Sequence, residues 1–276
     1  MKYLHNDSTD PYFNMAFDQH CLESTDFGEP VFYLWRNRPS VIIGISQNIW
    51  SEVNLDYLKE YGILPVRRVT GGGAVYHDLN NLNYSIIGKS KDLKEDYPEY
   101  TSIISGALCR LGVDARLSGR NDIMVNGKKV SGFAKRVWKD RVIIHGTLMY
   151  DVDMERLTAA LSAPGSKMDA KGVESVRSRV TNLKDMLPDM TSVLDLKDRL
   201  EDILSNSYKD PMLRLTDKDM DEIRRIASEK FSTWEWIYGK SPEASLTCRK
   251  KFSCGTVEAG ILIDRSIIKH IKFAGD

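Results

Sequence analysis

The chain has 276 residues, of which 42% are hydrophobic and 28% are charged. This length and composition fit an ordinary globular protein with one large domain, or with one domain and a small appendage. Basic and acidic residues balance at 39 each, which argues against a general nucleic-acid binder or a membrane-surface binder.

Four cysteines form neither a close pair nor a cluster with histidine: Cys21, Cys109, Cys248 and Cys254. Cys109 falls within a helical apolar pattern, so we expect it to be a small core residue. Residues 1–7 lack the apolar region of a secretion signal, and no segment approaches transmembrane length. These features predict a protein of the reducing cytoplasm.

The first part of the chain alternates helical and strand-like patterns. Asp10-Pro11 predicts the start of a helix over residues 11–23, because proline is favoured in the first helical turn. Apolar runs predict strands at 31–35 and 41–45, and the turn residues 37–40 between them indicate a hairpin. We further expect a helix at 53–61 and strands at 64–69, 74–77 and 82–87.

The middle of the chain carries the clearest helix signal. Apolar residues recur with helical spacing from Tyr97 to Leu111, and Gly112 closes the pattern. Asn126-Gly127 predicts a tight hairpin between two of the short strands that follow. The strands are expected at 113–117, 123–125, 129–134 and 142–150, followed by a helix at 154–161. The polar stretch 162–181 reads as a long loop, and such loops are often functional.

The last third predicts two amphipathic helices and then a change of character. The helices are expected at 193–204 and 220–227, with Thr216 as a possible N-cap. After Phe231, a tryptophan-rich segment leads into three strand-like runs at 248–255, 256–263 and 266–273. We therefore predict two units. Residues 1–230 would form a mixed α/β (α+β) domain with an antiparallel-rich sheet flanked by helices, and residues 231–276 a small partial module.

Residues 66–78 are the most unusual part of the sequence, because Gly71, Gly72 and Gly73 stand in a row between two apolar segments. Without side chains to cover the backbone, a ligand could approach several N–H donors, and Arg67 and Arg68 could supply charge for an anion. The stretch lacks the Gly-Lys-Ser/Thr of a P-loop, and strand-like residues follow it where a dinucleotide fingerprint needs a helix. The alternative is a glycine-rich hairpin turn with two solvated arginines.

Further along, polar residues interrupt apolar strands within one short region: Asn121, Asp122, Lys129, Arg136 and His145. Taken singly, Lys129 could be a solvated strand lysine and His145 a histidine satisfied in the core. Their occurrence together favours a functional site.

The chain resembles the lipoate–protein ligases through several motifs that occur in the order of that family. The matching segments are residues 10–16, 34–37, 67–78, 118–122, 129–132, 145–148 and 175–183. The similarity covers nearly all of residues 8–185 and is highly specific. Residues 234–242 are similar to the opening of the family's C-terminal accessory domain.

The resemblance implies an ATP-dependent enzyme that joins lipoate to ATP, forming lipoyl-adenylate (lipoyl-AMP) and pyrophosphate. The lipoyl group would then pass to a lysine ε-amine on a lipoyl carrier domain, with Mg²⁺ as the accompanying metal. The implied carriers are the lipoyl domains of 2-oxoacid dehydrogenase complexes and the glycine cleavage H protein. Neither a nucleic acid nor a membrane is expected as a partner.

The resemblance also implies residue roles. Lys129 would stabilise charge on the carbonyl and phosphate oxygens in both steps, and Asp122, oriented by Asn121, would bind Mg²⁺ or the phosphate side. Nucleotide and adenylate would contact Arg68, Val69, Thr70, Gly71, Gly72, Gly73, Ala74, Val75, Tyr76, His77, Asn121, Asp122, Lys129, Arg136, His145, Gly146 and Thr147. The lipoyl group would lie against Trp35, Arg68, Thr70, His77 and Lys129. The loop at 162–181 would fold over the adenylate and exclude water.

Related classes fit less well. Biotin ligases carry Gly-Arg-Gly-Arg-x-Gly where this chain has Arg-Arg-x-Thr-Gly-Gly-Gly, and octanoyl transferases need a cysteine nucleophile, whereas no cysteine lies between Arg110 and Thr247. The remaining alternatives are a lipoyl or octanoyl amidotransferase that uses preformed adenylate or an acyl-carrier donor, and a non-catalytic lipoyl- or nucleotide-binding regulator. A short accessory module would also favour transfer of supplied adenylate over activation of lipoate.

Overall fold

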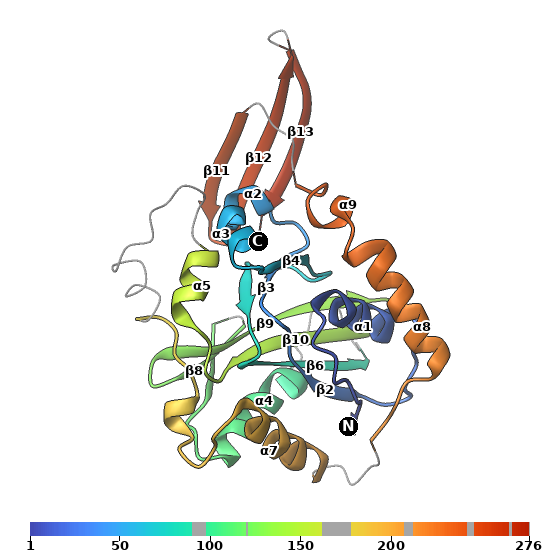
Figure 1. Cartoon of the computed structure of the whole chain (residues 1–276), viewed down its shortest axis with the longest axis vertical. Coiled ribbons are helices and arrows are strands. Elements are labelled where there is room, and N and C mark those ends of the chain that lie inside the picture. Colours follow the sequence, from blue (N-terminus) through green and yellow to red (C-terminus); the bar gives the residue numbers. More distant parts are fainter. Residues whose placement is uncertain are drawn as a thin grey trace.

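The computed structural model describes residues 1–89, 98–119, 121–161, 178–206, 212–241, 246–264 and 267–275. The described chain has a seven-stranded main sheet with helices on both faces, a small three-stranded sheet beside it, and another three-stranded sheet at one end (Figure 1). This arrangement confirms the predicted mixed α/β class, with an antiparallel-rich sheet flanked by helices.

The main sheet has the strand order β1-β2-β6-β10-β9-β8-β7. Its first two strands run parallel, and the other neighbouring pairs are antiparallel. The turn between β8 and β9 has Asn126 and Gly127 at φ 51° and 75°, which confirms the predicted tight hairpin. The strands are β1 Lys2–Tyr3, β2 Val31–Trp35, β6 Asn81–Lys89, β7 Arg116–Ser118, β8 Asp122–Val125, β9 Lys128–Trp138 and β10 Arg141–Met149.

The small sheet has the order β4-β3-β5, with β3 Ser40–Ile43 in the centre, β4 Leu64–Arg67 parallel to it and β5 Val75–His77 antiparallel. The predicted hairpin at 37–40 is therefore wrong, because β2 and β3 belong to different sheets. Every residue of both strands is buried, so the sequence holds no alternating pattern that would reveal their partners. The glycine stretch is likewise not a hairpin turn, since β4 and β5 lie on opposite sides of β3.

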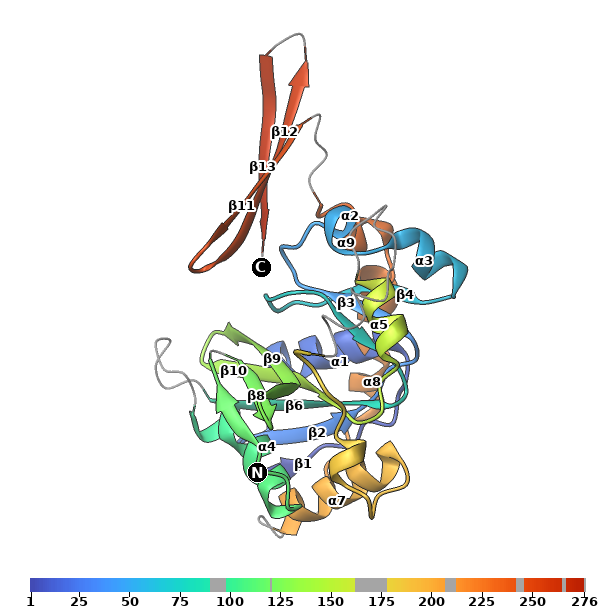
Figure 2. The same cartoon turned by 90° about the vertical axis from the view of Figure 1, so that its left-hand side faces the viewer.

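Helices cover both faces of the main sheet and bury two apolar clusters (Figure 2). Phe32 and Leu34 of β2 join the cluster under α4 and α7, whereas Val31, Tyr33 and Trp35 join the cluster under α1 and α8. This alternation follows from the two-residue period of a strand. The described helices are α1 Pro11–Glu23, α2 Ile49–Glu52, α3 Leu55–Glu60, α4 Pro98–Arg110, α5 Met154–Ala160, α7 Val193–Asn206, α8 Asp217–Ile226 and α9 Trp234–Ile237, with a 3₁₀ turn Lys184–Met186 and a π turn Ala227–Phe231.

Local sequence signals set several of these helix ends. The Asp10 side chain accepts hydrogen bonds from the N–H groups of Tyr12 and Phe13 at the start of α1, and Thr216 forms a capping box at α8. The expectation of a buried Cys109 is wrong, because this side chain lies on the exposed face of α4. Among the described residues, no helix has the length and apolar character needed to cross a membrane.

The C-terminal sheet consists of β11 Leu246–Phe252, β12 Gly255–Asp264 and β13 Ile267–Gly275. Its end nearest the main body contacts the region of α2. The N–H of Gly275 donates to the carbonyl of Ser46 at 2.9 Å, Asn48 donates to the Glu258 carboxylate, and Arg249 pairs with Glu52 at 2.6 Å. The division of the chain at residue 231 stays a prediction.

Arg67 joins three parts of the fold. Its guanidinium is fully buried at the end of β4, and Nη1 donates to the carbonyls of Gly44, Ile45 and Gln47 at 3.0, 3.2 and 2.7 Å. On the other side, Nε and Nη2 donate to the carbonyl of Ile237 at 3.1 and 2.7 Å. Burial lowers the pKa of Arg67 to about 10, so it stays charged at neutral pH. The arginine thus holds the 44–47 turn and α9 against β4.

We expect Arg67→Met to lower the free energy of unfolding by at least about 3 kcal/mol, because several buried carbonyls would lose their donors together. Urea unfolding followed by circular dichroism measures the change. Arg116→Met is the matched control, since Arg116 forms an exposed pair with Asp114 and should leave the unfolding curve almost unchanged. Equal stability of the two variants would contradict the structural role of Arg67.

Candidate active site

The glycine loop, defined here as residues 70–74, runs between β4 and β5 and is pressed against the 44–47 turn. A Cβ added at Gly44 would lie 2.1 Å from the carbonyl oxygen of Gly72, so only glycine permits this contact. Gly72 itself has φ 89°, a conformation that favours glycine. Within the described residues, the main-chain N–H groups of Gly71, Gly72 and Gly73 have no hydrogen-bond acceptor. The loop therefore presents free donors on a fixed backbone.

Arg68 holds the loop from inside. It is 5% exposed, and it donates to the carbonyls of Gly71 and Gly73 at 2.6 and 2.8 Å and to that of Ile42 at 3.0 Å. Burial lowers its pKa to about 10. The alternative of two solvated arginines is therefore wrong, because both guanidinium groups are buried and donate hydrogen bonds mainly to protein carbonyls.

A first cavity of about 160 Å³ opens below the glycine loop. Apolar side chains form much of its wall, and several polar groups converge on it. The lining residues are Met15, Trp35, Ile42, Arg68, Gly72, Gly73, Ala74, Val75, His77, Asn83, Asn121, Lys129, Gly132, Phe133, Ala134, His145, Gly146 and Thr147. Most of the residues singled out from the sequence thus meet at one cavity, although they come from distant parts of the chain.

A second cavity of about 630 Å³ adjoins the first and shares Gly72, Asn121, Phe133 and Ala134 with it. Gly71 and Asp122 line only this second cavity. Because Gly71 lines only the second cavity and Gly72 lines both, the glycine loop runs along the boundary between the two cavities.

Lys129 lines the first cavity and pairs with Asp122 of the second. Its Nζ is 2.7 Å from Oδ1 of Asp122, and both side chains are about one-third exposed, at 35%. A Cβ added at Gly132 would lie 2.7 Å from Nζ, so the absence of a side chain there leaves room for the lysine. The main chain of Lys129 is held too, because its N–H donates to Arg179 at 2.9 Å and its carbonyl accepts from Thr181 at 3.0 Å.

One row of residues crosses the main sheet beneath the first cavity. Asn83 of β6 is opposite both Trp35 of β2 and Thr147 of β10. The N–H of Gly132 in β9 donates to Oγ1 of Thr147 at 3.4 Å, and Gly132 is paired with Asp122 of β8. Residues paired across a sheet point to the same face. The row therefore connects Trp35 at one end with the Lys129–Asp122 pair at the other.

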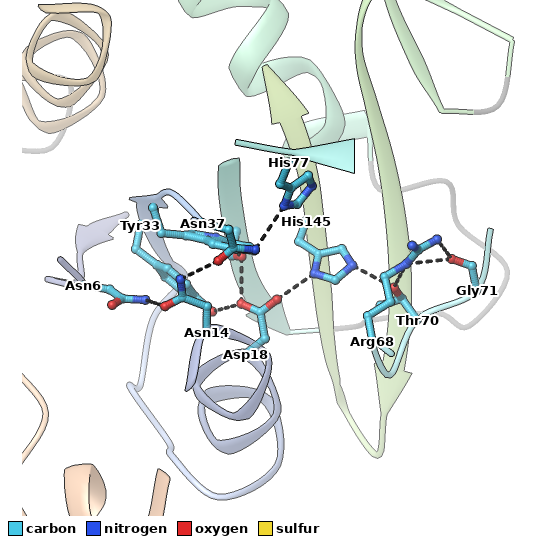
Figure 3. Close-up of polar contacts among 12 residues, drawn as sticks. Asn6, Asn14, Asp18, Tyr33, Asn37, Arg68, Thr70, Gly71, His77 and His145 are labelled. Atoms are coloured by element: carbon cyan, nitrogen blue, oxygen red, sulfur yellow. Dashed lines mark hydrogen bonds and ion pairs between the residues drawn. The ribbon is translucent and has the colours of Figure 1, made fainter. Parts of the chain in front are cut away.

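Two of the cavity-lining residues, His145 and His77, belong to buried polar networks (Figure 3). In the first, Nδ1 of His145 is 2.6 Å from Oδ2 of Asp18, and Nε2 is 2.7 Å from the Thr70 hydroxyl. In the second, Asn37 bonds to Nδ1 of His77 at 3.1 Å. Burial, with the nearby charge of Arg68, lowers the pKa of His77 to about 3, so that this ring is neutral.

Some predicted residues lie outside both cavities. Thr70 at the start of the loop, and Val69 and Tyr76 beside the loop, are buried but are not lining residues. Arg136 is not brought to either cavity, because its Nη1 pairs with Glu23 at 2.7 Å and its guanidinium lies over the Trp138 ring. Residues 162–177, most of the predicted covering loop, fall outside the described residues.

Sequence reasoning missed several residues at this site: Met15, Asp18, Ile42, Gly44, Asn83, Gly132 and Phe133. Asn83 left a signal, since Asn81 and Asn83 interrupt an apolar strand at alternate positions. Asp18 lies one helical turn after Asn14, which also is buried, but the apolar pattern of α1 does not mark either as internal. In the described residues, no group of three or more His, Cys, Asp or Glu side chains is arranged to hold a metal.

Residues 10–205 match the family described as the lipoyl protein ligase A/B catalytic domain. The chain belongs to this family. Lipoate-protein ligase LplJ of Bacillus subtilis is 37% identical over 281 residues, which cover 100% of this chain and 85% of that protein.

Solved structures are similar as well. The bi-partite lipoate protein ligase of Thermoplasma acidophilum, studied with its E2 lipoyl domain, has a TM-score of 0.79 at 31% identity and covers 89% of this chain and 98% of its own. A lipoate-protein ligase A bound with ATP has a TM-score of 0.74 at 30% identity, covering 87% and 98%. The family, inferred from motifs, is thus confirmed by the match to the family model and by relatives that cover between 87% and 100% of this chain.

We expect Gly44→Ala to reduce ligase activity at least about a hundredfold, because the added methyl group would displace the glycine loop by an ångström or more. The measurement is the rate of acyl transfer per folded protein, with folding verified by circular dichroism. Gly106→Ala is the control, because a Cβ there meets nothing within 4 Å in the exposed side of α4. A fully active Gly44→Ala enzyme would show that the contact with Gly72 is dispensable.

Proposed function

We propose that this chain, an ATP-dependent lipoate–protein ligase, binds lipoate in the first cavity and the nucleotide at the glycine loop and second cavity. The observation that carries this assignment is the position of Lys129, which lines the first cavity while its ammonium pairs at 2.7 Å with Asp122, a residue of the second cavity. When two negatively charged groups react, a positive group between them reduces their repulsion and stabilises the charge of the transition state. The apolar wall of the first cavity suits an acyl chain, and the free N–H donors of the loop suit phosphate.

The row of residues across the sheet supports one orientation of lipoate. Neighbouring strands are about 4.8 Å apart, so Gly132 and Asn83, two strands apart, are separated by about 10 Å. An extended chain advances about 3.5 Å for every three bonds, so the five bonds between the lipoyl carbonyl carbon and the ring span roughly 6 Å, and the ring itself extends further. The carbonyl therefore belongs beside Lys129, above Gly132, and the ring near Asn83 and Trp35.

In the first step, a carboxylate oxygen of lipoate attacks the α-phosphorus of ATP, and the bond from that phosphorus to the pyrophosphate oxygen breaks. The carboxylate and phosphate must approach each other although both are negative. Lys129 would reduce this repulsion, and the N–H groups of Gly71, Gly72 and Gly73 would stabilise the phosphate oxygens. The product is lipoyl-adenylate, a mixed anhydride.

In the second step, the unprotonated ε-amine of a carrier lysine attacks the lipoyl carbonyl. The bond from the carbonyl carbon to the AMP oxygen breaks, AMP leaves with the electron pair, and the amine releases a proton. Negative charge grows on the carbonyl oxygen during attack and on the phosphate as AMP departs. One ammonium beside both oxygens, that of Lys129, serves both changes.

The residues present fit Mg²⁺. Asp122 offers one carboxylate and Asn121 one amide beside the second cavity, and Mg²⁺ commonly binds one or two carboxylates together with substrate phosphates. When bound, the ion would neutralise phosphate charge. Asp122 would hold the ion and, in its absence, pairs with Lys129.

The acceptors in this proposal are lipoyl carrier domains, those of 2-oxoacid dehydrogenase complexes and the glycine cleavage H protein. The similar ligase from Thermoplasma acidophilum, described together with its E2 lipoyl domain, supports this class of partner. We also place the reaction in the reducing cytoplasm, which suits three exposed free cysteines, Cys109, Cys248 and Cys254.

We expect Lys129→Ala to slow both pyrophosphate release and carrier acylation at least about a hundredfold, because one positive group is removed from both steps. Lys128→Ala is the matched control, since this adjacent side chain is exposed and lines neither cavity. The assay combines a pyrophosphate measurement with mass spectrometry of an apo-lipoyl domain after incubation with lipoate and MgATP. Normal acylation by folded Lys129→Ala would overturn the proposed site.

A second prediction separates the ligase from a thioester mechanism. None of the four cysteines lines either cavity, and burial raises the pKa of the Cys21 thiol, which disfavours the reactive thiolate. Replacing Cys21 and Cys109 by alanine and Cys248 and Cys254 by serine should therefore leave acylation per folded molecule nearly unchanged. An acyl-thioester found on any cysteine of the native protein would favour the octanoyl-transferase mechanism instead.

A further inference from the structure

Asp18 has a buried carboxylate whose role is not accounted for by contact with either cavity. It projects from α1, is 1% exposed and lines neither space. Its Oδ1 accepts hydrogen bonds from Tyr33 at 2.5 Å and from Ser85 at 2.9 Å, while its Oδ2 faces Nδ1 of His145 at 2.6 Å (Figure 3). A buried charge is costly unless several donors satisfy it, and here three donors do so.

Only one assignment of donors and acceptors satisfies every hydrogen bond around His145. An ionised carboxylate accepts but cannot donate, so Nδ1 of His145 carries the proton that faces Asp18. Nε of Arg68 donates to Oγ1 of Thr70 at 2.9 Å, which leaves the Thr70 hydroxyl proton to be placed. That proton fits Nε2 of His145, 2.7 Å away, only if Nε2 is unprotonated. The network therefore assigns the neutral Nδ1–H tautomer to His145.

The same chain of bonds ends at the glycine loop. Arg68, fixed by Thr70, uses its Nη2 to hold the carbonyls of Gly71 and Gly73 at 2.6 and 2.8 Å. Each member of the chain orients the next one: Asp18 orients His145, His145 orients Thr70, and Thr70 orients Arg68. These bonds connect Asp18 on α1 with the glycine loop (Figure 3).

We propose that Asp18 is a positioning residue, which fixes the tautomer of His145 and thereby, through Thr70 and Arg68, sets the shape of the glycine loop for nucleotide binding. The last part rests on the proposed function, which places the ATP phosphates at that loop. Asp18 touches neither substrate. Its effect should appear in the affinity for ATP more than in the rate of the bound complex.

Asp18→Asn tests the direction of the network with little change in shape. With the amide oxygen kept toward Tyr33 and Ser85, the amide N–H₂ faces Nδ1 of His145 and requires it to accept. His145 then carries its proton on Nε2, both Nε2 and Arg68 donate to Thr70, and the Thr70 hydroxyl proton loses its acceptor. Thr70→Val interrupts the same chain one step later by removing that hydroxyl.

The experiment uses the full chain and combines structure with kinetics. Nitrogen-15 NMR of the histidine rings reports the tautomer of His145, assigned with a His145→Gln sample. Steady-state kinetics with lipoate, MgATP and an apo-lipoyl domain give KM for ATP and kcat for Asp18→Asn, Thr70→Val and the double variant. Asp219→Asn is the matched control, because Asp219 forms another aspartate–histidine pair, with His20 at 3.0 Å, away from both cavities.

We expect the native protein to carry the His145 proton on Nδ1 and Asp18→Asn to move it to Nε2. Each single substitution should raise KM for ATP about tenfold, the scale of one hydrogen bond, with kcat nearly retained. The double variant should resemble either single variant, because both interrupt one chain. Asp219→Asn should leave KM for ATP unchanged.

Three results would overturn the proposal: an Nε2–H tautomer in the native protein, additive effects on KM in the double variant, or a fall in kcat with KM unchanged. The proposed function has a separate test, since normal acylation by Lys129→Ala would contradict the proposed active site itself. If Asp18→Asn fails to fold, the His145 tautomer of the native protein and the KM of Thr70→Val still test the proposal. An unchanged KM for ATP in Thr70→Val would contradict transmission from His145 to the loop.

Discussion

The structure depends on two adjacent buried arginines at the end of β4. Because successive side chains of a strand point to opposite faces, Arg67 and Arg68 reach different neighbours from nearly the same place. Arg67 holds the 44–47 turn and α9, while Arg68 holds the glycine loop. Backbone carbonyls, which are parts of the loops to be fixed, accept these hydrogen bonds. Each arginine therefore fixes its neighbouring loop through several hydrogen bonds from one buried guanidinium group.

This arrangement has an electrostatic consequence for the cavity. The positive charge of Arg68 lies at the glycine loop with no carboxylate partner among the described residues, so the loop region favours an anion even though the chain as a whole has no net charge. The nearby His77 ring stays neutral in this setting, because burial and the charge of Arg68 lower its pKa to about 3. Neutral rings leave the positive charge of the site to the arginines and Lys129.

Much of the fold could be predicted from local signals, but strand pairing could not. Asp10-Pro11, Asn126-Gly127 and Thr216 mark element ends through bonds within a few residues, and the structure has those ends. The proposed hairpin at 37–40 failed because the partners of β2 and β3 lie far along the chain. The site divides in the same way. The glycine stretch and Lys129 stood out as sequence patterns, whereas Gly44 and Asp18 matter only through contacts made after folding.

The placement of Lys129 shows how a small irregularity can make a site. In β9, Gly132 and Ser131 are opposite Asp122 and Ile123, but the register then shifts, so that Lys129 is opposite Met124. Val130 is the extra residue of this bulge, and it is fully buried in the core. In a regular strand, Val130 would share the face of Gly132 and Lys129 would point into the core, because each one-residue step reverses the side. The bulge exchanges them. It buries Val130 and turns Lys129 to the cavity face. Because Gly132 has no side chain, the side chain of Lys129 has room to reach Asp122.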